Sequence, residues 1–149
     1  MLIYMLTRFF QVDNNVRDEV VGSAFRVVHC EGARESFEAA LRRVEARKQK
    51  SFRRGMTQQI QRFADGHRMS SENFPREGDL PKKANGESAG HFHALKRIPV
   101  RGYCWRSERF ENTWFISHYV YKDYQKLKAR DAERLGKNWI RIEVNGDER

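Results

Sequence analysis

Five cationic side chains lie close together in the second half of the chain, and their types suit chemistry on a phosphate. Arginine and lysine can hold a phosphate in place and offset the negative charge that develops on its oxygens. The five fall within a stretch of 14 residues: Lys96, Arg97, Arg101, Arg106 and Arg109. Any one of them could instead belong to a solvated strand face, but the group together predicts a phosphate-binding surface.

Aromatic and basic residues follow in the next stretch of sequence. His118 sits inside an aromatic run and its ring can titrate near neutral pH, so it is either a general acid or base or a packed core histidine. Tyr121 and Tyr124 flank Lys122, where they either stack on bases or close the core. Lys122 and Lys126 are candidate contacts to a nucleic-acid backbone, or else solvated surface.

Metal-ligating patterns are weak in this sequence. His91 and His93 lie two residues apart, on one face of a strand, but these two imidazoles lack a third ligand nearby. Cys30 and Cys104 lie 74 residues apart and show neither a zinc spacing nor the cysteine density of a disulfide scaffold. We therefore expect no metal site and two reduced, packed cysteines.

The whole chain is strongly basic. Its 149 residues include 29 lysines and arginines against 20 acidic residues, for a net charge of +9. Such an excess attracts polyanions, which include nucleic acids, anionic membrane surfaces and acidic proteins. We expect a nucleic acid as the partner, RNA before DNA. No apolar stretch approaches the ~18 residues that span a bilayer and no signal peptide is present, so a cytoplasmic protein is expected.

The elements that must position these residues are predicted from periodicity. Alternation predicts a strand over 24–30, and apolar residues at helical spacing predict two helices, near 34–49 and 52–65, folded as a hairpin. Residues 66–90 are rich in glycine, proline and polar residues and predict a long loop. Residues 1–22 are interpreted as an N-terminal appendage to the domain.

The cationic and aromatic residues fall on three further predicted strands. These cover about 91–98, 102–109 and 113–122, and their short connections indicate an antiparallel meander. A short C-terminal helix follows, and residues 140–144 could add a last strand. This order predicts a single α+β domain over 23–149, with an N-terminal strand and a helical hairpin packed on an antiparallel sheet.

In the order of these elements the chain resembles the RelE/ParE superfamily of bacterial toxins, and within it a phage-derived branch. The resemblance covers residues 24–142 and runs from FRVVHC through the paired helices ending in RFADG to FHALKRIPVRGYCWRSE and FISHYVYKDYQKLKARDAERL. Family members typically show a late hydrophobic strand that runs into lysines, followed by a helix with an alanine in its middle. Here those features are residues 114–121, Lys122, Lys126 and Ala132.

This resemblance implies a function. Toxins of this kind, from type II toxin–antitoxin pairs, are similar to metal-independent endoribonucleases that cleave mRNA, often on the ribosome and without a cofactor. The ribose 2′-OH attacks the adjacent phosphate, so the protein must align the phosphate, offset charge and manage two proton transfers. The implied catalytic residues are Arg106 (the first choice for phosphate contact), His118, Lys96 and Tyr121. The implied RNA-binding residues are Arg97, Arg101, Arg109, Lys122, Lys126 and Tyr124. The implied partner is an acidic or DNA-binding antitoxin protein.

Other functions fit the same sequence. A non-catalytic nucleic-acid-binding protein would bind with strong salt dependence and without cleavage. A ParE-like protein would inhibit a DNA topoisomerase and would lack the arginine, lysine and histidine set on the sheet; that set is present, which favours RNA. A membrane-surface protein is disfavoured, because the sequence has no strongly amphipathic basic helix with tryptophan on its apolar face.

Overall fold

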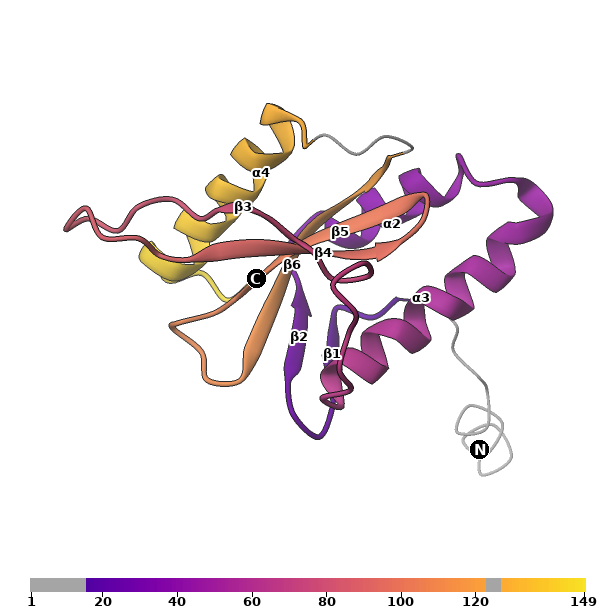
Figure 1. Ribbon diagram of the computed structural model, residues 1–149, viewed down its shortest axis with the longest axis horizontal. Coiled ribbons are helices and arrows are strands. Elements are labelled where there is room, and N and C mark those ends of the chain that lie inside the picture. Colours follow the sequence, from indigo (N-terminus) through magenta and orange to yellow (C-terminus); the bar gives the residue numbers. More distant parts are fainter. Residues whose placement is uncertain (1–15, 123–126) are drawn as a thin grey trace, which may run out of the picture.

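The chain folds into one mixed, six-stranded sheet with helices on both of its faces (Figure 1). The computed structural model describes residues 16–122 and 127–149. The strands are β1 (Glu19–Val21), β2 (Arg26–His29), β3 (Arg76–Asp79), β4 (His91–Arg97), β5 (Val100–Arg106) and β6 (Thr113–Tyr121). They are ordered β1-β2-β6-β5-β4-β3, and neighbours pair antiparallel except β2 and β6, which are parallel.

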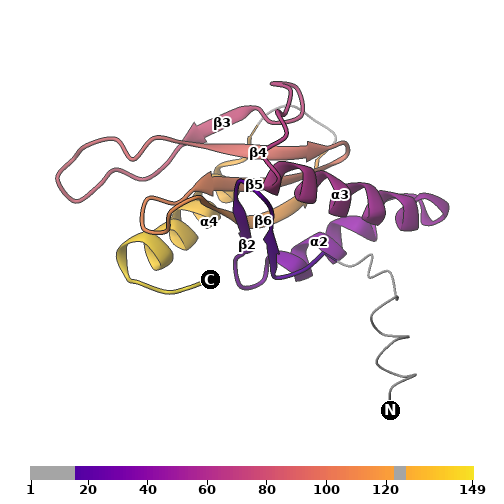
Figure 2. The ribbon, with the colours of Figure 1, turned by 90° about the horizontal axis from the view of Figure 1, so that it is seen from below.

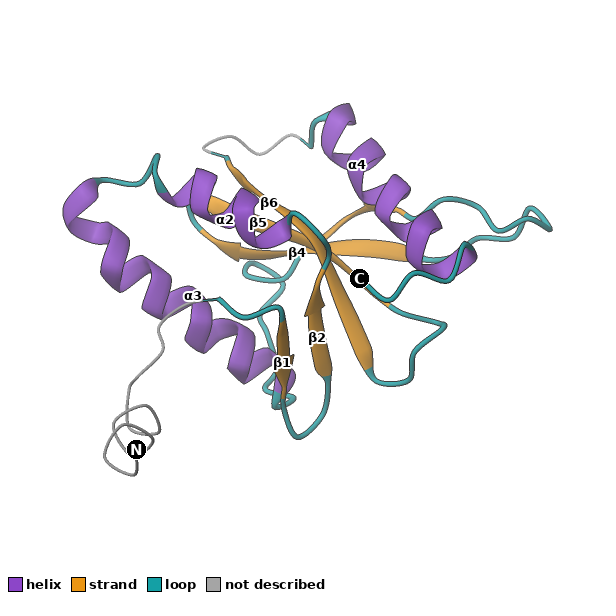
Figure 3. Ribbon diagram, turned by 180° about the vertical axis from the view of Figure 1, so that it is seen from behind, coloured by secondary structure: helices purple, strands orange, loops and turns teal. Residues whose placement is uncertain are grey.

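Helices cover the sheet in two layers. The helical elements are α2 (Ala33–Leu41), η1 (Ala46–Lys48), α3 (Gln49–Ala64), α4 (Ala129–Trp139) and η2 (Ile140–Val144). Helices α2 and α3 pack on one face and α4 on the other, which can be followed from opposite sides in Figures 1 and 3. The view in Figure 2 shows the connection between β3 and β4 extending away from the body of the molecule.

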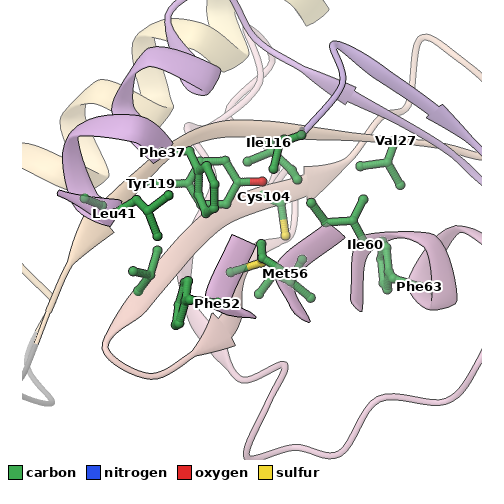
Figure 4. Packing of buried hydrophobic residues seen from close by; sticks show 14 of the residues in the cluster. Val27, Phe37, Leu41, Phe52, Met56, Ile60, Phe63, Cys104, Ile116 and Tyr119 are labelled. Carbon is green, nitrogen blue, oxygen red and sulfur yellow. The ribbon is translucent and has the colours of Figure 1, made fainter. Parts of the chain in front are cut away.

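Alternation along the strands builds two separate cores. Successive residues of a strand point to opposite faces of the sheet. Ile116 of β6 packs in one cluster with Phe37 of α2 and Met56 of α3, and part of this cluster is drawn in Figure 4. Phe115, the preceding residue, packs in the other cluster with Leu135 of α4. Because both faces are buried, the central strands are nearly continuous apolar runs.

The predicted fold class is confirmed, with changes in detail. The fold is α+β, and β4, β5 and β6 form the predicted antiparallel meander. The sheet as a whole is mixed and not purely antiparallel, because β2 lies parallel to β6. Strand β1 lies within the range 1–22 assigned to the appendage, and β3 lies within the predicted loop 66–90. The rest of the appendage, residues 1–15, lies outside the described residues.

The boundary predicted for the first helix was wrong. Helix α2 ends at Leu41 and not near residue 49, because the backbone tightens there: the Val44 N–H donates to the Leu41 carbonyl at 2.9 Å. A one-turn element, η1, then leads directly into α3. Because α2 ends at Leu41 and η1 begins at Ala46, the apolar residues of α2 and α3 do not follow one continuous helical period.

The strand considered for residues 140–144 was also wrong, since this segment is a π-helical continuation of α4. Its Ile142 is fully buried and packs in the same cluster as Leu135, seven residues earlier. That spacing is two helical turns, so the helical period continues through the segment.

Both cysteines are free and buried, as predicted. Burial raises the pKa of the Cys30 thiol to about 12, so this side chain is not a nucleophile at neutral pH. None of the helices in the described ranges is long and apolar enough to cross a membrane.

Candidate active site

Three cations from adjacent strands meet at one end of the sheet. Lys96 of β4 lies directly opposite Arg101 of β5, and Lys122 follows the end of β6. Only 9% of Lys96, 4% of Arg101 and 3% of Lys122 is exposed. Like charges opposite each other on neighbouring strands are destabilising, and buried charge is costly. This placement therefore marks a candidate functional site.

A β-bulge in β6 turns Lys122 toward the other two cations. The pairing of β5 with β6 shifts by one residue, which leaves Ser117 as an extra residue between Ile116 and His118. An extra residue reverses the alternation of every later side chain in the strand. Lys122 therefore lies on the α4 face, where its ammonium contacts Tyr103.

Two carboxylates enter the group from β3 and α4. The Glu77 carboxylate accepts a hydrogen bond from Arg101 Nη1 at 3.0 Å. Asp131 is 6% exposed and lies 3.2 Å from the ring of His118. We call the whole group the polar cluster, and its members are Lys96, Arg101, Tyr103, His118, Lys122, Glu77 and Asp131. Within the described residues, the polar cluster thus brings three cations together with two carboxylates, a tyrosine and a histidine.

Lys122 and Tyr103 form the pair best placed to transfer a proton. Lys122 Nζ donates to the Tyr103 hydroxyl at 3.4 Å. Burial, and then the charge of Arg101, lowers the pKa of Lys122 below its ordinary value. Burial raises the pKa of Tyr103. The amine thus loses its proton more readily than a free lysine, while the phenol stays protonated.

His118 belongs to a chain of hydrogen bonds with a fixed direction. Asn138 Nδ2 donates to Ser117 Oγ at 2.9 Å, and the Ser117 hydroxyl donates to His118 Nδ1 at 2.8 Å. His118 Nε2 then donates to the Asp131 carboxylate at 3.2 Å. Burial, and then the charge of Arg134, lowers the pKa of His118, so the ring is neutral at pH 7. Both ring nitrogens are engaged within the protein, which suits a positioning role.

Two of the predicted catalytic residues lie away from the polar cluster. Arg106 is exposed near the opposite end of β5, with its guanidinium 5.3 Å from the centre of the Phe25 ring. The strand places it roughly 17 Å from Arg101. Tyr121 lies on the α2–α3 face, where the Arg43 guanidinium is 4.2 Å from the centre of its ring.

The other predicted RNA-binding residues are also dispersed. Arg97 lies on the α3 side, with its guanidinium 5.7 Å from the centre of the Phe52 ring. Arg109 holds the C-terminal segment by donating to the Asp147 carbonyl at 2.6 Å. Outside the described residues lie Tyr124 and Lys126. Of the predicted set, the structure brings together Lys96, Arg101, His118 and Lys122.

The remaining members of the polar cluster, Tyr103, Asp131 and Glu77, were not among the residues predicted from the sequence. Tyr103 could have been found, because it lies two residues after Arg101 in the same strand and therefore on the same face. Asp131 could have been found too, since it precedes the buried Leu135 by one helical turn. Glu77 could not have been predicted, because it lies in a segment without a clear periodicity and its partner, Arg101, is 24 residues away in the sequence.

The two histidines considered as metal ligands have other contacts. His91 Nδ1 lies 2.7 Å from a carboxylate oxygen of Asp79. The His93 ring stacks on Phe74 with the ring centres 4.7 Å apart. Within residues 16–122 and 127–149, no group of three or more histidine, cysteine, aspartate or glutamate side chains is arranged to hold a metal ion.

Comparisons with protein families, with curated proteins and with solved structures found no match for this chain.

Proposed function

We propose that the protein is a metal-independent endoribonuclease that cleaves RNA at the polar cluster, and that it is the toxin of a type II toxin–antitoxin pair. The observation that carries the enzymatic part is the convergence of Lys96, Arg101 and Lys122 in a largely buried site beside a tyrosine hydroxyl. Cations that converge at one site bind an anion through charge-assisted hydrogen bonds, and a phosphodiester is such an anion. The toxin role rests on the resemblance and on the net charge of +9.

Each group has a role in the proposed reaction. Arg101 and Lys96 bind the non-bridging phosphate oxygens and offset their growing charge. The neutral amine of Lys122 takes the proton of the 2′-OH, and the 2′-oxygen attacks phosphorus. The bond from phosphorus to the 5′-oxygen breaks, and the Tyr103 hydroxyl protonates that oxygen. The products are a 2′,3′-cyclic phosphate and a 5′-OH end. Lys122 then returns its proton to Tyr103 through their hydrogen bond.

In the proposed reaction His118 positions Tyr103 and does not contact RNA. The centres of the two rings lie 5.4 Å apart, and the residues are directly opposed on β6 and β5. The hydrogen bonds to Ser117 and Asp131 fix the imidazole plane. A fixed ring packed against Tyr103 limits the movement of the phenol, and such alignment is a large part of catalysis in a bound complex.

The substrate reaches the cations by replacing Glu77. A carboxylate and a phosphate are both anions that accept hydrogen bonds from a guanidinium. The Glu77 carboxylate therefore already occupies the place at Arg101 that a phosphate would take. Strand β3, which carries Glu77, is only four residues long, lies at the edge of the sheet and is irregular in its pairing with β4. A short edge strand is the element that can separate from the sheet at the lowest cost.

An acidic antitoxin protein is the proposed inhibitor of this chain. A partner of opposite charge would associate rapidly with a chain of net charge +9, and it would compete with RNA for the same cations. Co-expression with such a partner should relieve growth arrest.

The direct test is cleavage of a labelled RNA by the purified full chain in the presence of a metal chelator. We expect Arg101→Ala and Lys122→Ala to lower the rate by about 100-fold or more, as loss of a charge-stabilising or proton-transfer group usually does. The matched control is Arg106→Ala, which removes the same side chain from the same strand and should keep most of the activity. Induced expression in a bacterial host should cause growth arrest and new mRNA 5′ ends, and both should be lost with Arg101→Ala.

A non-catalytic RNA-binding protein is the second candidate, and one observation favours it. Both nitrogens of His118 are engaged inside the protein, so the only histidine of the polar cluster is not open to substrate. In that case RNA would bind with a steep salt dependence and remain intact. The same assay separates the two functions, because binding without cleavage excludes the nuclease.

A further inference from the structure

A second basic feature lies on the opposite side of the sheet from the polar cluster. A pocket of about 420 Å³ opens between α3, the segment 67–73 and the end of β4. We call it the arginine pocket, and its basic lining residues are Arg62, Arg68, Arg97 and His67. Arg97 directly follows Lys96 in β4, so the two side chains point to opposite faces and the two sites are separate.

The turn after α3 places two of these side chains beside the helix. Gly66 has a positive φ of 84°, its N–H donates to the Phe63 carbonyl, and the His67 N–H donates to the Arg62 carbonyl. This pair of bonds is the Schellman arrangement that ends a helix and reverses the chain. His67 and Arg68 therefore return along α3 and face Arg62, which is on its last turn.

A glycine in the middle of α3 makes room for the third arginine. A Cβ atom built on Gly55 would lie 2.2 Å from Arg97 Nη2 and 2.3 Å from its Cζ. Glycine is a poor residue for a helix interior, so its presence here needs a reason. That reason is the close approach of the Arg97 guanidinium, which lies against the bare helix backbone and reaches the pocket.

Hydrogen bonds fix the floor of the pocket. The Lys96 N–H donates to the Asn73 carbonyl at 2.8 Å, and Gln59 Nε2 donates to the Lys96 carbonyl at 2.8 Å. These bonds tie β4 to the segment 67–73 on one side and to α3 on the other. The walls are therefore held in place before any ligand binds, which reduces the entropy lost on binding.

The charge of the pocket is not balanced by neighbouring carboxylates. Some cations elsewhere on the surface have acidic partners, as Arg26 has Glu19 and Arg53 has Glu38. In the part of the chain that the structure describes, none of the ion pairs involves a charged residue of the pocket. Its lining residues include no aspartate or glutamate among those described. Three arginines without acidic partners around one cavity are the donor set that binds phosphate.

We propose that the arginine pocket binds a phosphate group, either of a mononucleotide or of an RNA chain. The volume lies within the range of small-molecule sites and exceeds that of a lone phosphate, so a sugar or base can enter with it. The amides of Gln58, Gln59 and Asn73 add groups that both donate and accept, as base edges require. This inference does not depend on the proposed nuclease activity.

The test measures the equilibrium binding of three ligands to the full-length protein. The ligands are inorganic phosphate, AMP and a short 2′-O-methyl oligoribonucleotide, which lacks the 2′-OH and cannot be cleaved. Two variants address the pocket. Arg97→Gln removes one charge, and Gly55→Ala places a methyl group where the Arg97 guanidinium lies. The matched control is Arg54→Gln, which removes one exposed arginine of α3 outside the pocket.

We expect both pocket variants to weaken binding by about tenfold and the control to change it by less than about twofold. If AMP and phosphate bind and respond in this way, the ligand is a free nucleotide. If only the oligonucleotide binds and its binding is weakened in the pocket variants, the ligand is an RNA backbone. Arg97→Gln should then lower the slope of log binding constant against log salt concentration by about one. Equal losses in Arg54→Gln and Arg97→Gln, or no binding of the three ligands, would overturn the proposal. Because Arg101 lies in the polar cluster, a loss of AMP binding in Arg101→Ala but not in Arg97→Gln would place the bound phosphate at the polar cluster and overturn the proposal.

Discussion

The Glu77 carboxylate accepts a hydrogen bond from the Arg101 guanidinium at 3.0 Å, and this contact joins the edge strand β3 to β5 across β4. The side chain of Arg101 is only 4% exposed and that of Glu77 11%. In such surroundings the attraction between two charges is strong, but each has lost its hydration. An anion that offers more acceptor oxygens than Glu77 can therefore take its place at Arg101.

Glu77→Gln should strengthen RNA binding while weakening the fold. The substitution removes the competing charge, so we expect the affinity for a non-cleavable RNA to rise by about three- to tenfold. The free energy of unfolding should fall by about 1–3 kcal/mol, because a buried ion pair loses one partner. The matched control is Glu87→Gln, an exposed residue with the same change of charge. An equal gain in both variants would show that net charge, and not the contact with Arg101, limits binding.

Cleavage should rise with pH through the lowered pKa of Lys122. Burial, and then the charge of Arg101, favours the neutral amine, which is the form that accepts the 2′-OH proton. The rate of wild type should therefore increase with pH and level off below the ordinary lysine value near 10.5. Lys122→Arg should lose this increase together with most of the activity, since arginine stays protonated. The exposed Lys137→Arg is the control, and an unchanged profile in Lys122→Arg would contradict the assignment.

His29 should make the fold less stable in mild acid. Its Nδ1 donates to the Arg17 carbonyl and its Nε2 accepts from the Tyr119 hydroxyl, each at 2.6 Å. Burial lowers the pKa of His29 from 6.5 to about 4. Between these values the unfolded chain binds more protons than the folded chain. The stabilisation is therefore complete above pH 6.5 and is lost as the pH falls toward 4, by about 3 kcal/mol.

The measurement is urea denaturation at a series of pH values. His29→Asn keeps a donor for the Arg17 carbonyl but does not titrate, so it should be less stable than wild type at pH 7.5 and show a shallower loss on acidification. Parallel pH curves for the two proteins would mean that other groups cause the acid sensitivity. His118 contributes in the same direction, since burial lowers its pKa as well.

The elements of this fold could largely be predicted from local patterns, whereas the composition of the site could not. The run 113–122 is rich in residues that favour strands and is apolar on both faces, so a strand was predicted there correctly. The bulge at Ser117 could not be predicted from that pattern, because serine is neither strongly apolar nor a residue that indicates a turn. If the bulge is left out, simple alternation from Ile116 places Lys122 on the α2–α3 face and Tyr121 on the α4 face, the reverse of what the structure has. The predicted set consequently mixed residues of both faces, such as Tyr121 with Lys96.

Ser117→Ala should destabilise the protein although it removes a single oxygen. The hydroxyl accepts from Asn138 Nδ2 and donates to His118 Nδ1, and all three groups lie at the contact of β6 with α4. The buried His118 Nδ1 would lose its partner, and Asn138 Nδ2 would keep only the Ser117 carbonyl at 3.4 Å, so we expect a loss of about 1–3 kcal/mol in the free energy of unfolding. Ser51→Ala on the exposed side of α3 is the control and should change stability by less than about 0.5 kcal/mol. Equal stabilities of the two variants would mean that this chain of hydrogen bonds contributes nothing.

Two glycine-to-alanine substitutions should have opposite effects on stability. A Cβ on Gly22 would lie 2.2 Å from the backbone carbon of Ala64, at the end of α3, where the N–H groups of Ala24 and Phe25 both donate to the Ala64 carbonyl. Backbone held in this way cannot yield as a flexible side chain would. Gly22→Ala should therefore lower the free energy of unfolding by about 1–3 kcal/mol or more.

Gly136 offers the comparison, because it lies inside α4 and its Cβ would approach the Pro81 side chain at 3.4 Å. Gly136→Ala should raise the free energy of unfolding by about 0.5–1 kcal/mol, since alanine is the better helix former. Denaturant titrations of both variants at pH 7.5 measure the two effects. A stable Gly22→Ala protein would show that β1 and α3 can move apart, and the packing of the N-terminal edge of the sheet against α3 would then be looser than the contact at Ala64 requires.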